Sequence, residues 1–573
     1  MVIGAGLAGC EAALQCARRG VPVRLVEMRP GKMTEAHETG DVAELVCSNS
    51  LKSDEPENAH GLLKAELRIL GSVLLECAER ARIPGGKALV VDRRRFSAEV
   101  RSELERAGVS VEQAEVSSLP PPSPWYRPQC ELSDPHQPTA DFLPSPLRGE
   151  GKGEGEITVV ATGPLTSQPM AEALQAMLGA EHLFFYDAIA PIVAAESLDM
   201  SRVFAGSRYG AGDSPDDARC KGQDARCKIE GAERKRGDAE KSDVRCEMSD
   251  VRSEPTASRE SPVAASGYLN CPMSEEEYGR FVDALLAAEL HSLHEFEKGV
   301  SGKQGTVPRS ANVELGAGQS PFSAPTFFEG CLPVEEIARR GRLALAFGPM
   351  KPVGLVDPRT GSRSFAVVQL RRENAEGTMY NLVGFQTRLR QGEQERVFRM
   401  IPGLEKATFL RFGSIHRNTF LDSPRVLLPT LQARASPDLL VAGQLTGVEG
   451  YVESIGAGLV AGINAARLAR GEEPVELPRD MMLGSLLRYI TASASDSSLE
   501  CGSAAPALPT PPGKAAASAL GTVPIRGQSP AFQPMNANFG LLPPLGKRLR
   551  GRDKRRAMAE RALEAARLFA LRV

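Results

Sequence analysis

A glycine-rich segment at the start of the chain could bind the phosphates of a nucleotide. Residues 1–9 read MVIGAGLAG, a short apolar run followed by G-x-G-x-x-G and then by a helical pattern. Gly4 permits a tight turn, Gly6 lets the backbone approach a pyrophosphate, and Gly9 allows a helix to pack closely on its strand. Unpaired N–H groups at the helix N-terminus favour an anion there. The segment predicts a dinucleotide site formed by Gly4, Ala5, Gly6, Leu7, Ala8 and Gly9.

An acidic residue follows at the spacing that such a site requires. Glu27 closes the next apolar run, Val21–Met28, where a carboxylate can bind a ribose hydroxyl. A lone G-x-G-x-x-G is a weak signal, but here strand, glycines, helix and acid occur in register. We therefore expect dinucleotide binding rather than a chance turn.

Two segments far downstream indicate FAD rather than NAD. Ile157–Ala161 is an apolar run that ends in Thr162-Gly163, and it resembles the second signature of flavoproteins with two dinucleotide domains. Leu440–Gln444, followed by a small-residue helix, resembles their C-terminal signature, in which a helix N-terminus faces the flavin. The alternative is ordinary packing of strand against helix. The residues expected at the cofactor are Thr162, Gly163, Gly443, Gln444, Gly450, Tyr451 and Glu453.

Longer motifs carry a resemblance to one family. They are GAGLAG (Gly4–Gly9), ELVCSNSL (Glu44–Leu51), ATGPLTS (Ala161–Ser167), YLNCPM (Tyr268–Met273), FGPMKPVGL (Phe347–Leu355), AGQLTGVEGYVES (Ala442–Ser454) and QPMNANFG (Gln533–Gly540). With these motifs the chain resembles the folate-dependent tRNA (uracil-5-)-methyltransferases, flavoproteins that make ribothymidine in the tRNA T-loop.

The resemblance gives two cysteines an expected role. Uracil C5 becomes nucleophilic once a thiolate has added to C6, so the family needs thiols, flavin and folate in one cleft. By resemblance, Cys271 is the expected uracil nucleophile, and Cys47 the second active-site thiol, which shields or resolves the one-carbon unit. The alternative is that both are buried small hydrophobic residues, as free cysteines usually are. No residue stands out as the base that removes the C5 proton.

The same resemblance implies cofactors and partners. FAD is expected as the bound cofactor, with methylenetetrahydrofolate and either NADH or NADPH as co-substrates. The expected macromolecular partner is tRNA, with no DNA, membrane or metal. The spacing of Cys220, Cys227 and Cys246 fits no zinc pattern, Cys331 is expected to be structural, and Cys10 and Cys16 are expected to pack on the first helix.

Basic residues could contact RNA. Lys547–Arg556 holds seven basic residues and one acidic residue, and a helix is predicted over Ala557–Leu571. Such a cluster suits phosphate contacts, although a solvated helix start is the alternative. Arg93–Arg95 either bind RNA or are simply exposed residues at the start of a helix. Other cationic or polar groups that could hold folate glutamate or RNA phosphate, or simply be solvated, are Lys351, Arg388 and His416–Asn418.

Apolar patterning predicts the elements that position these residues. Strands are expected at Val2–Ile3, Val21–Met28 and Ile157–Ala161, and helices at Gly9–Arg19, Ser454–Arg470 and Ser274–Lys298. The last helix should start at a capping box formed by Ser274 and Glu277.

We predict an α/β fold in which a Rossmann-like FAD-binding domain carries an inserted, smaller α+β domain. The FAD-binding domain comprises 1–118, 157–166 and 412–493, the inserted domain 167–411, and a C-terminal segment with a basic helix 531–573. Low-complexity insertions are expected at 119–156, 212–264, 300–324 and 494–530. Residues 212–264 hold too few large apolar side chains to offset the entropy of ordering, and the other three are rich in Pro, Gly, Ser, Ala or Glu, so all four are expected to be disordered. They are either regulatory loops or insertions tolerated at the surface.

Composition excludes several classes of protein. The 573 residues carry 69 basic and 72 acidic side chains, which excludes a protein that coats DNA but permits an enzyme with a local basic patch. No apolar run approaches the roughly 20 residues of a membrane span. Eleven cysteines are too dilute for a disulfide framework, so we expect a cytoplasmic protein.

Two rival functions remain open at this stage. The related flavoprotein family that builds the carboxymethylaminomethyl group of the wobble uridine shares the first motif, including a cysteine after the third glycine, here Cys10. That family is longer through a helical C-terminal domain and lacks VCSNSL and YLNCPM. The other rival is an inactive RNA-binding protein that retains FAD as a structural filler.

Overall fold

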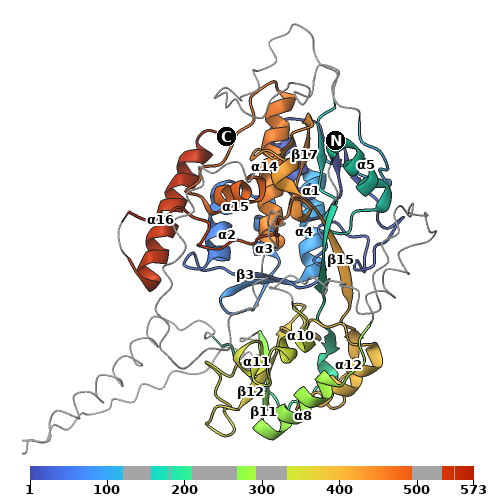
Figure 1. Ribbon diagram of the computed structural model, residues 1–573, viewed down its shortest axis with the longest axis vertical. Coiled ribbons are helices and arrows are strands. Elements are labelled where there is room, and N and C mark those ends of the chain that lie inside the picture. The colour runs from blue at the N-terminus through green and yellow to red at the C-terminus, as the bar shows by residue number, and fades with distance from the viewer. Residues whose placement is uncertain (121–155, 180–181, 209–266, 292–331, 493–531, 547–548) are drawn as a thin grey trace, which may run out of the picture.

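The computed structural model describes residues 1–120, 156–179, 182–208, 267–291, 332–492, 532–546 and 549–573. The four predicted insertions fall almost entirely outside these ranges. The described residues form a larger lobe, which contains both ends of the chain, and a smaller lobe beside it (Figure 1).

A mostly parallel sheet of six strands organises the larger lobe. Its strand order is β16-β17-β7-β1-β2-β6, and all neighbours are parallel except β16 and β17. The strands are β1 (Val2–Ile3), β2 (Leu25–Glu27), β6 (Val111–Gln113), β7 (Thr158–Val160), β16 (Gln432–Ala433) and β17 (Ser436–Val441). Strands from the beginning, middle and end of the chain therefore meet in one Rossmann-like sheet, with β1 next to β7 although the two are far apart in sequence.

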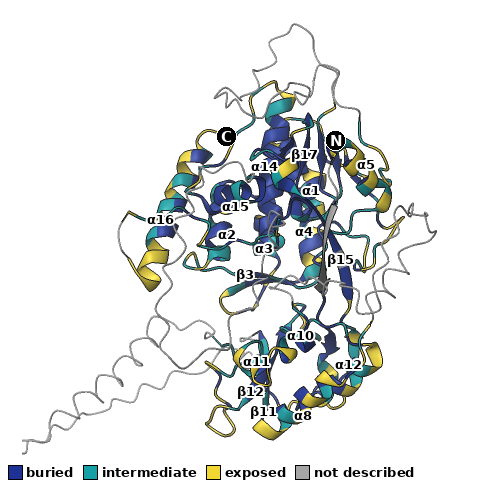
Figure 2. Cartoon of the chain, viewed as in Figure 1, coloured by how far each residue is buried: buried dark blue, intermediate teal, exposed yellow. Residues whose placement is uncertain are grey.

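Helices α1 (Leu7–Arg18) and α14 (Tyr451–Ala469) cross closely behind this sheet. Small residues permit the contact: a Cβ at Gly458 would lie 2.2 Å from the Ala8 carbonyl oxygen. Nearly all of α14 is buried (Figure 2). The helices predicted at Gly9–Arg19 and Ser454–Arg470 are thus confirmed, each starting slightly earlier than expected.

Further elements surround this core. The other helices of the larger lobe are α2 (Ala59–Ile69), α3 (Val73–Arg80), α4 (Arg93–Arg106), α5 (Gln168–Leu178), α13 (Ser423–Val426), α15 (Met482–Thr491) and α16 (Gly551–Ala570). A three-stranded sheet is formed by β3 (Ser50–Ser53), β5 (Ala88–Val91) and β4 (Arg82–Ile83). Among the described residues, no helix is both long enough and apolar enough to cross a membrane.

An antiparallel sheet forms the base of the smaller lobe. In sheet order its strands are β10 (Phe204–Ala205), β11 (Tyr268–Met273), β12 (Ala366–Arg372), β13 (Met379–Leu382), β9 (Ile192–Ala194) and β14 (Phe409–Arg411). Its helices are α8 (Glu275–Leu286), α10 (Val334–Arg339), α11 (Ala344–Phe347) and α12 (Gln391–Phe398). The predicted capping box is present at the start of α8, because Ser274 and Glu277 exchange hydrogen bonds. The helix ends at Leu286, earlier than predicted.

Two antiparallel strands, β8 (His182–Ala188) and β15 (Ile415–Leu421), connect the lobes. Helix α5 precedes β8, and its Met170 and Leu174 pack in one apolar cluster with Ile3 and Val160 of the larger lobe. Residues 168–178, which the sequence analysis assigns to the inserted domain, therefore pack on the Rossmann-like sheet, because their apolar face is buried there.

Candidate active site

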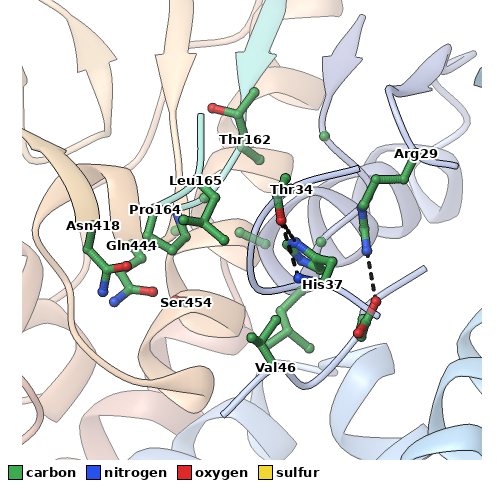
Figure 3. A pocket seen from close by; sticks show the side chains of 18 of the residues that line it. Arg29, Thr34, His37, Val46, Thr162, Pro164, Leu165, Asn418, Gln444 and Ser454 are labelled. Atoms are coloured by element: carbon green, nitrogen blue, oxygen red, sulfur yellow. Dashed lines mark hydrogen bonds and ion pairs between the residues drawn. The ribbon is translucent and has the colours of Figure 1, made fainter. Parts of the chain in front are cut away.

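A cleft opens at the carboxyl ends of the parallel strands, where ligands of such sheets bind. Figure 3 shows Asn418 and Gln444 on one side of the cleft, and Arg29 and His37 on the other. The predicted site residues that line it are Gly4, Gly6, Leu7, Ala8, Glu27, Cys47, Thr162, Gly163, Gly443, Gln444 and Tyr451.

The three glycines of the first motif have different surroundings. Gly4 has a φ of +98°, and a Cβ there would lie 2.6 Å from the Ala161 carbonyl oxygen. A Cβ at Gly9 would lie 1.8 Å from the carbonyl oxygen of Gly4. At Gly6, by contrast, a Cβ would meet no protein atom within 4 Å. Gly4 and Gly9 thus allow the close approach of backbones, whereas Gly6 borders open space beside the N-terminus of α1.

Glu27 is held in place by its neighbours. Its Oε2 accepts a hydrogen bond from the Ala5 N–H at 2.7 Å, and its Oε1 accepts from Arg29 Nε at 3.0 Å. Burial alone would raise the pKa of Glu27, but the Arg29 guanidinium and the two backbone N–H groups outweigh burial and lower it. The carboxylate is therefore ionised and oriented at the edge of the cleft, where it can accept a hydroxyl hydrogen bond.

Arg29 is a cleft residue that the sequence analysis missed. Its side chain is 3% exposed, and its Nη1 forms an ion pair with Glu44 Oε2 at 3.1 Å in addition to its bond to Glu27. Nearby, Thr34 Oγ1 and His37 Nδ1 lie 2.6 Å apart. Burial and the charge of Arg29 lower the pKa of His37 to about 4, so its ring is neutral at pH 7.

Four predicted cofactor residues do not line the cleft: Ala5, Gly9, Gly450 and Glu453. Glu453 is buried in the first turn of α14, where it accepts hydrogen bonds from the Ala537 N–H and from His60 Nδ1, both at 3.0 Å. Although burial raises the pKa of Glu453, the His60 bond and nearby positive charge lower it to about 2. Glu453 thus ties α14 to the Gln533–Gly540 segment, and its expected contact with the cofactor stays a prediction.

Cys47 lies at the cleft beside Tyr451. The Cys47 sulfur and the Tyr451 hydroxyl oxygen are 2.9 Å apart. The same oxygen accepts hydrogen bonds from the Cys47 N–H at 2.8 Å and the Ser48 N–H at 3.1 Å. Because these N–H groups occupy the acceptor positions of the oxygen, the phenol O–H is oriented to donate to the sulfur. Among the described residues that line the cleft, Cys47 is the one thiol.

Cys271 lies elsewhere, which corrects its expected position at the cleft. It is 0% exposed in the core of the smaller lobe, packed with residues such as Met273 and Phe281. The alternation of β11 turns Cys271 to the same face as Leu269 and Met273, toward this core. Burial raises the pKa of the Cys271 thiol, which disfavours the nucleophilic thiolate.

Of the remaining predicted residues, some line the cleft and others lie away from it. Cys10 and Cys16 are buried in α1, and their thiols donate to the carbonyl oxygens of Ala5 and Gly462, each at 3.2 Å. Arg388 pairs with Glu336 in the smaller lobe. His416 and Asn418 line the cleft, and Lys351 does not.

Cys220, Cys227, Cys246 and Cys331 lie outside the described residues. Within the described part of the chain, no group of three His, Cys, Asp or Glu side chains could hold a metal ion.

Comparisons with known proteins place the chain in a family. It is 45% identical to the methylenetetrahydrofolate--tRNA-(uracil-5-)-methyltransferase TrmFO of Moorella thermoacetica, over 98% of this chain and 96% of the relative. The proteins of the same name from Desulforudis audaxviator and Geobacter sulfurreducens are 44% and 43% identical, again over 98% of this chain and 96% of each relative. The chain belongs to the TrmFO family.

The TrmFO family assignment agrees with two more distant likenesses. The family model of glucose inhibited division protein A (GidA) matches residues 1–245 and 318–473. The solved structure of Aquifex aeolicus GidA superimposes with a TM-score of 0.51 at 17% identity, covering 86% of this chain and 67% of that one. The structural likeness supports the fold alone.

The surroundings of Gly6 generate a test. Gly6→Ala should leave the protein folded, because the new methyl group meets no protein atom, while it occupies the space that a pyrophosphate needs. We expect the dinucleotide content of the purified protein, measured by absorbance, to fall at least about tenfold, with the urea midpoint of unfolding unchanged when the dinucleotide-free proteins are compared.

The matched control is Gly392→Ala, since Gly392 also borders open space but lies in the smaller lobe. Equal dinucleotide content in both variants would show that the ligand does not approach Gly6.

Proposed function

We propose that this chain methylates uridine at C5 in tRNA, with methylenetetrahydrofolate as carbon donor and FAD as bound cofactor. The observation that carries the proposal is the 42–45% identity to curated TrmFO proteins over nearly the full chain. The position of a thiol at the mouth of a dinucleotide cleft supports it independently.

The cleft residues fit FAD. The open space beside Gly6 and the N-terminus of α1 suit the pyrophosphate, and the ionised Glu27 suits a ribose hydroxyl. The N-terminus of α14, with Tyr451 in its first turn, faces the other end of the cleft, where its dipole favours negative charge. When bound, FAD supplies the two electrons that convert a methylene group to a methyl group.

Cys47 is the better-placed thiol for the uracil ring. A thiolate that adds to uracil C6 pushes electron density to C5, which can then form a bond to the one-carbon unit. Loss of the C5 proton and release of the sulfur restore the aromatic ring. Because Cys271 is enclosed in the smaller lobe and Cys47 borders the cleft, we assign the addition to Cys47, in place of the role expected for Cys271.

The electron balance requires a further reductant. Methylenetetrahydrofolate carries its carbon at the oxidation level of formaldehyde, and methylation therefore consumes two electrons per turnover when tetrahydrofolate is released. We propose that NADH or NADPH supplies them by reducing the flavin again. The proposed target is the uridine of the T-loop, which must leave its stack to reach a thiol within a cleft.

Basic residues at the start of α16 offer a surface for tRNA. The helix begins at Gly551, so Arg552, Lys554, Arg555 and Arg556 of the predicted basic cluster occupy its first turns, where they are exposed (Figure 2), while Lys547 and Arg548 lie outside the described residues. Arg552 and Arg556 pair with Glu57, whereas no ion pair is among the contacts described for Lys554 and Arg555. Cations at a helix N-terminus oppose the helix dipole, and an RNA phosphate at this point would relieve that repulsion.

A methylation assay tests the function. Purified protein with FAD, NADPH, carbon-labelled methylenetetrahydrofolate and unmodified tRNA transcript should yield labelled 5-methyluridine on nucleoside analysis. Protein that retains flavin but leaves the RNA unlabelled would contradict the proposal and favour the inactive RNA-binding alternative. A modified wobble uridine would favour the carboxymethylaminomethyl family.

Covalent trapping tests the assignment of the thiol. A transcript containing 5-fluorouridine lacks the C5 proton, so the enzyme should remain joined to C6 of the ring after addition. We expect peptide mapping to place the adduct on Cys47, and Cys47→Ala to lower methylation at least about a hundredfold. An adduct on Cys271, with Cys47→Ala still forming it, would refute the assignment.

A charge-removal series tests the tRNA surface. Lys554→Gln combined with Arg555→Gln should weaken tRNA binding about tenfold near physiological salt and reduce the salt slope by roughly 1–2. The matched control removes the same charge at the other end of α16, by Arg567→Gln and Arg572→Gln. If both pairs weaken binding equally, only net charge matters and the proposed surface is wrong.

A further inference from the structure

Arginines from separate elements converge on the loop that carries Cys47. Arg93, the first residue of α4, donates from Nη1 to the carbonyl oxygens of Leu45 at 2.9 Å and Val46 at 3.3 Å. Arg411, the last residue of β14, donates from Nη1 to the Val46 oxygen at 2.8 Å. Two guanidinium groups therefore bind the peptide that precedes the thiol.

A third arginine binds the other side of the same loop. Arg371 of β12 donates from Nη2 to Ser48 Oγ at 2.9 Å and from Nε to Asn49 Oδ1 at 2.8 Å. Asn49 in turn donates to the Arg372 carbonyl oxygen at 3.0 Å. Residues 45–49 are thus fixed on both sides of Cys47, and two of the three arginines belong to the smaller lobe.

The charges around this loop do not cancel. Glu373, whose side chain is 2% exposed, pairs with Arg93 at 2.9 Å and with Arg371 at 3.6 Å. Arg411 pairs with Glu38 at 2.8 Å. Three guanidinium groups therefore share two carboxylates. Because all three guanidinium groups bind residues 45–49, their positive charge would favour a thiolate at Cys47.

The other charged groups of the cleft carry one negative charge in excess, because Glu27 and Glu44 share Arg29, so the formal charges of the whole cleft balance. What distinguishes Arg93, Arg371 and Arg411 is that they bind residues 45–49 directly. Tyr451 is neutral and donates to the sulfur, because burial and the adjacent thiol raise its pKa. Glu44 is shared between Arg29 and the N–H groups of Glu38 and Thr39. The remaining titratable side chains that line the cleft are Glu27, His37 and His416. Glu27 is bound to Arg29, and His37 is uncharged at neutral pH.

We propose that Arg93, Arg371 and Arg411 position the Cys47 thiol and supply the positive charge that favours its anionic, reactive form. The inference rests on the proposed function, which gives the thiol its task, and it deepens that function by naming what makes the thiol reactive. The three arginines act through the sulfur and are positioning residues. The sheet of the smaller lobe thereby contributes to chemistry in the larger lobe.

The test measures the thiol directly. Flavin-containing protein is labelled with iodoacetamide across a range of pH, and the labelled Cys47 peptide is quantified by mass spectrometry. Arg411→Met removes the charge and keeps an apolar stem, so it should raise the pH of half-maximal labelling by about one unit, which is about tenfold slower labelling at neutral pH. Arg411→Lys keeps the charge, so it should raise the pH of half-maximal labelling by less than about half of the shift seen in Arg411→Met.

Further variants keep the test decisive. Arg93→Met should shift the labelling in the same direction from the side of α4, which preserves the test if Arg411→Met does not fold. The matched control is Arg388→Met, because Arg388 is 14% exposed, close to the 11% of Arg411, but pairs with Glu336 away from the cleft. Its half-labelling pH should equal that of the unmodified protein.

Two results would overturn the inference. One is an unchanged labelling profile in folded Arg411→Met and Arg93→Met proteins. The other is an equal shift in Arg411→Met, Arg411→Lys and Arg388→Met, which would reflect general loosening. Labelling needs neither tRNA nor folate, so shifted labelling in the variants, together with an unmodified protein that does not methylate tRNA, contradicts the proposed function alone. An active enzyme with unshifted labelling contradicts this inference alone.

Discussion

The close approach of backbones around Gly4 and Gly9 is the constraint on which the cleft depends. The turn after β1 fits against Ala161 only without a Cβ at Gly4, and α1 reaches the turn only without a Cβ at Gly9. The absence of a Cβ at Gly458 likewise lets α14 cross close to α1. Helix α1 therefore starts directly at the end of β1, and its N-terminus, the end of β7 and the N-terminus of α14 come together at one cleft.

Much of this arrangement could be predicted because its signals are local. A glycine motif between a strand and a helix, an acid after the next strand, and small residues along α14 each encode their own geometry within a few residues. The capping box of Ser274 and Glu277 is equally local and was predicted correctly, although the helix end was not. Tertiary packing, which sequence pattern does not reveal, decides where such helices stop.

The residues whose positions could not be predicted share a physical reason. The YLNCPM motif marks Cys271, but only the register of β11 in its sheet shows that the side chain turns into the core. Glu453 follows Tyr451 closely in sequence, yet the helical turn directs it away from the cleft toward His60. Arg371 and Arg411 could not be recognised as partners of Cys47, since folding alone brings these distant residues together.

The origin of two of these arginines in the smaller lobe couples the thiol to the joint between the lobes. Because Arg371 and Arg411 extend from the sheet of the smaller lobe, any separation of the lobes withdraws two positive charges from beside the sulfur. The environment of the thiol thus depends on the packing of both lobes, and not on the dinucleotide-binding lobe alone.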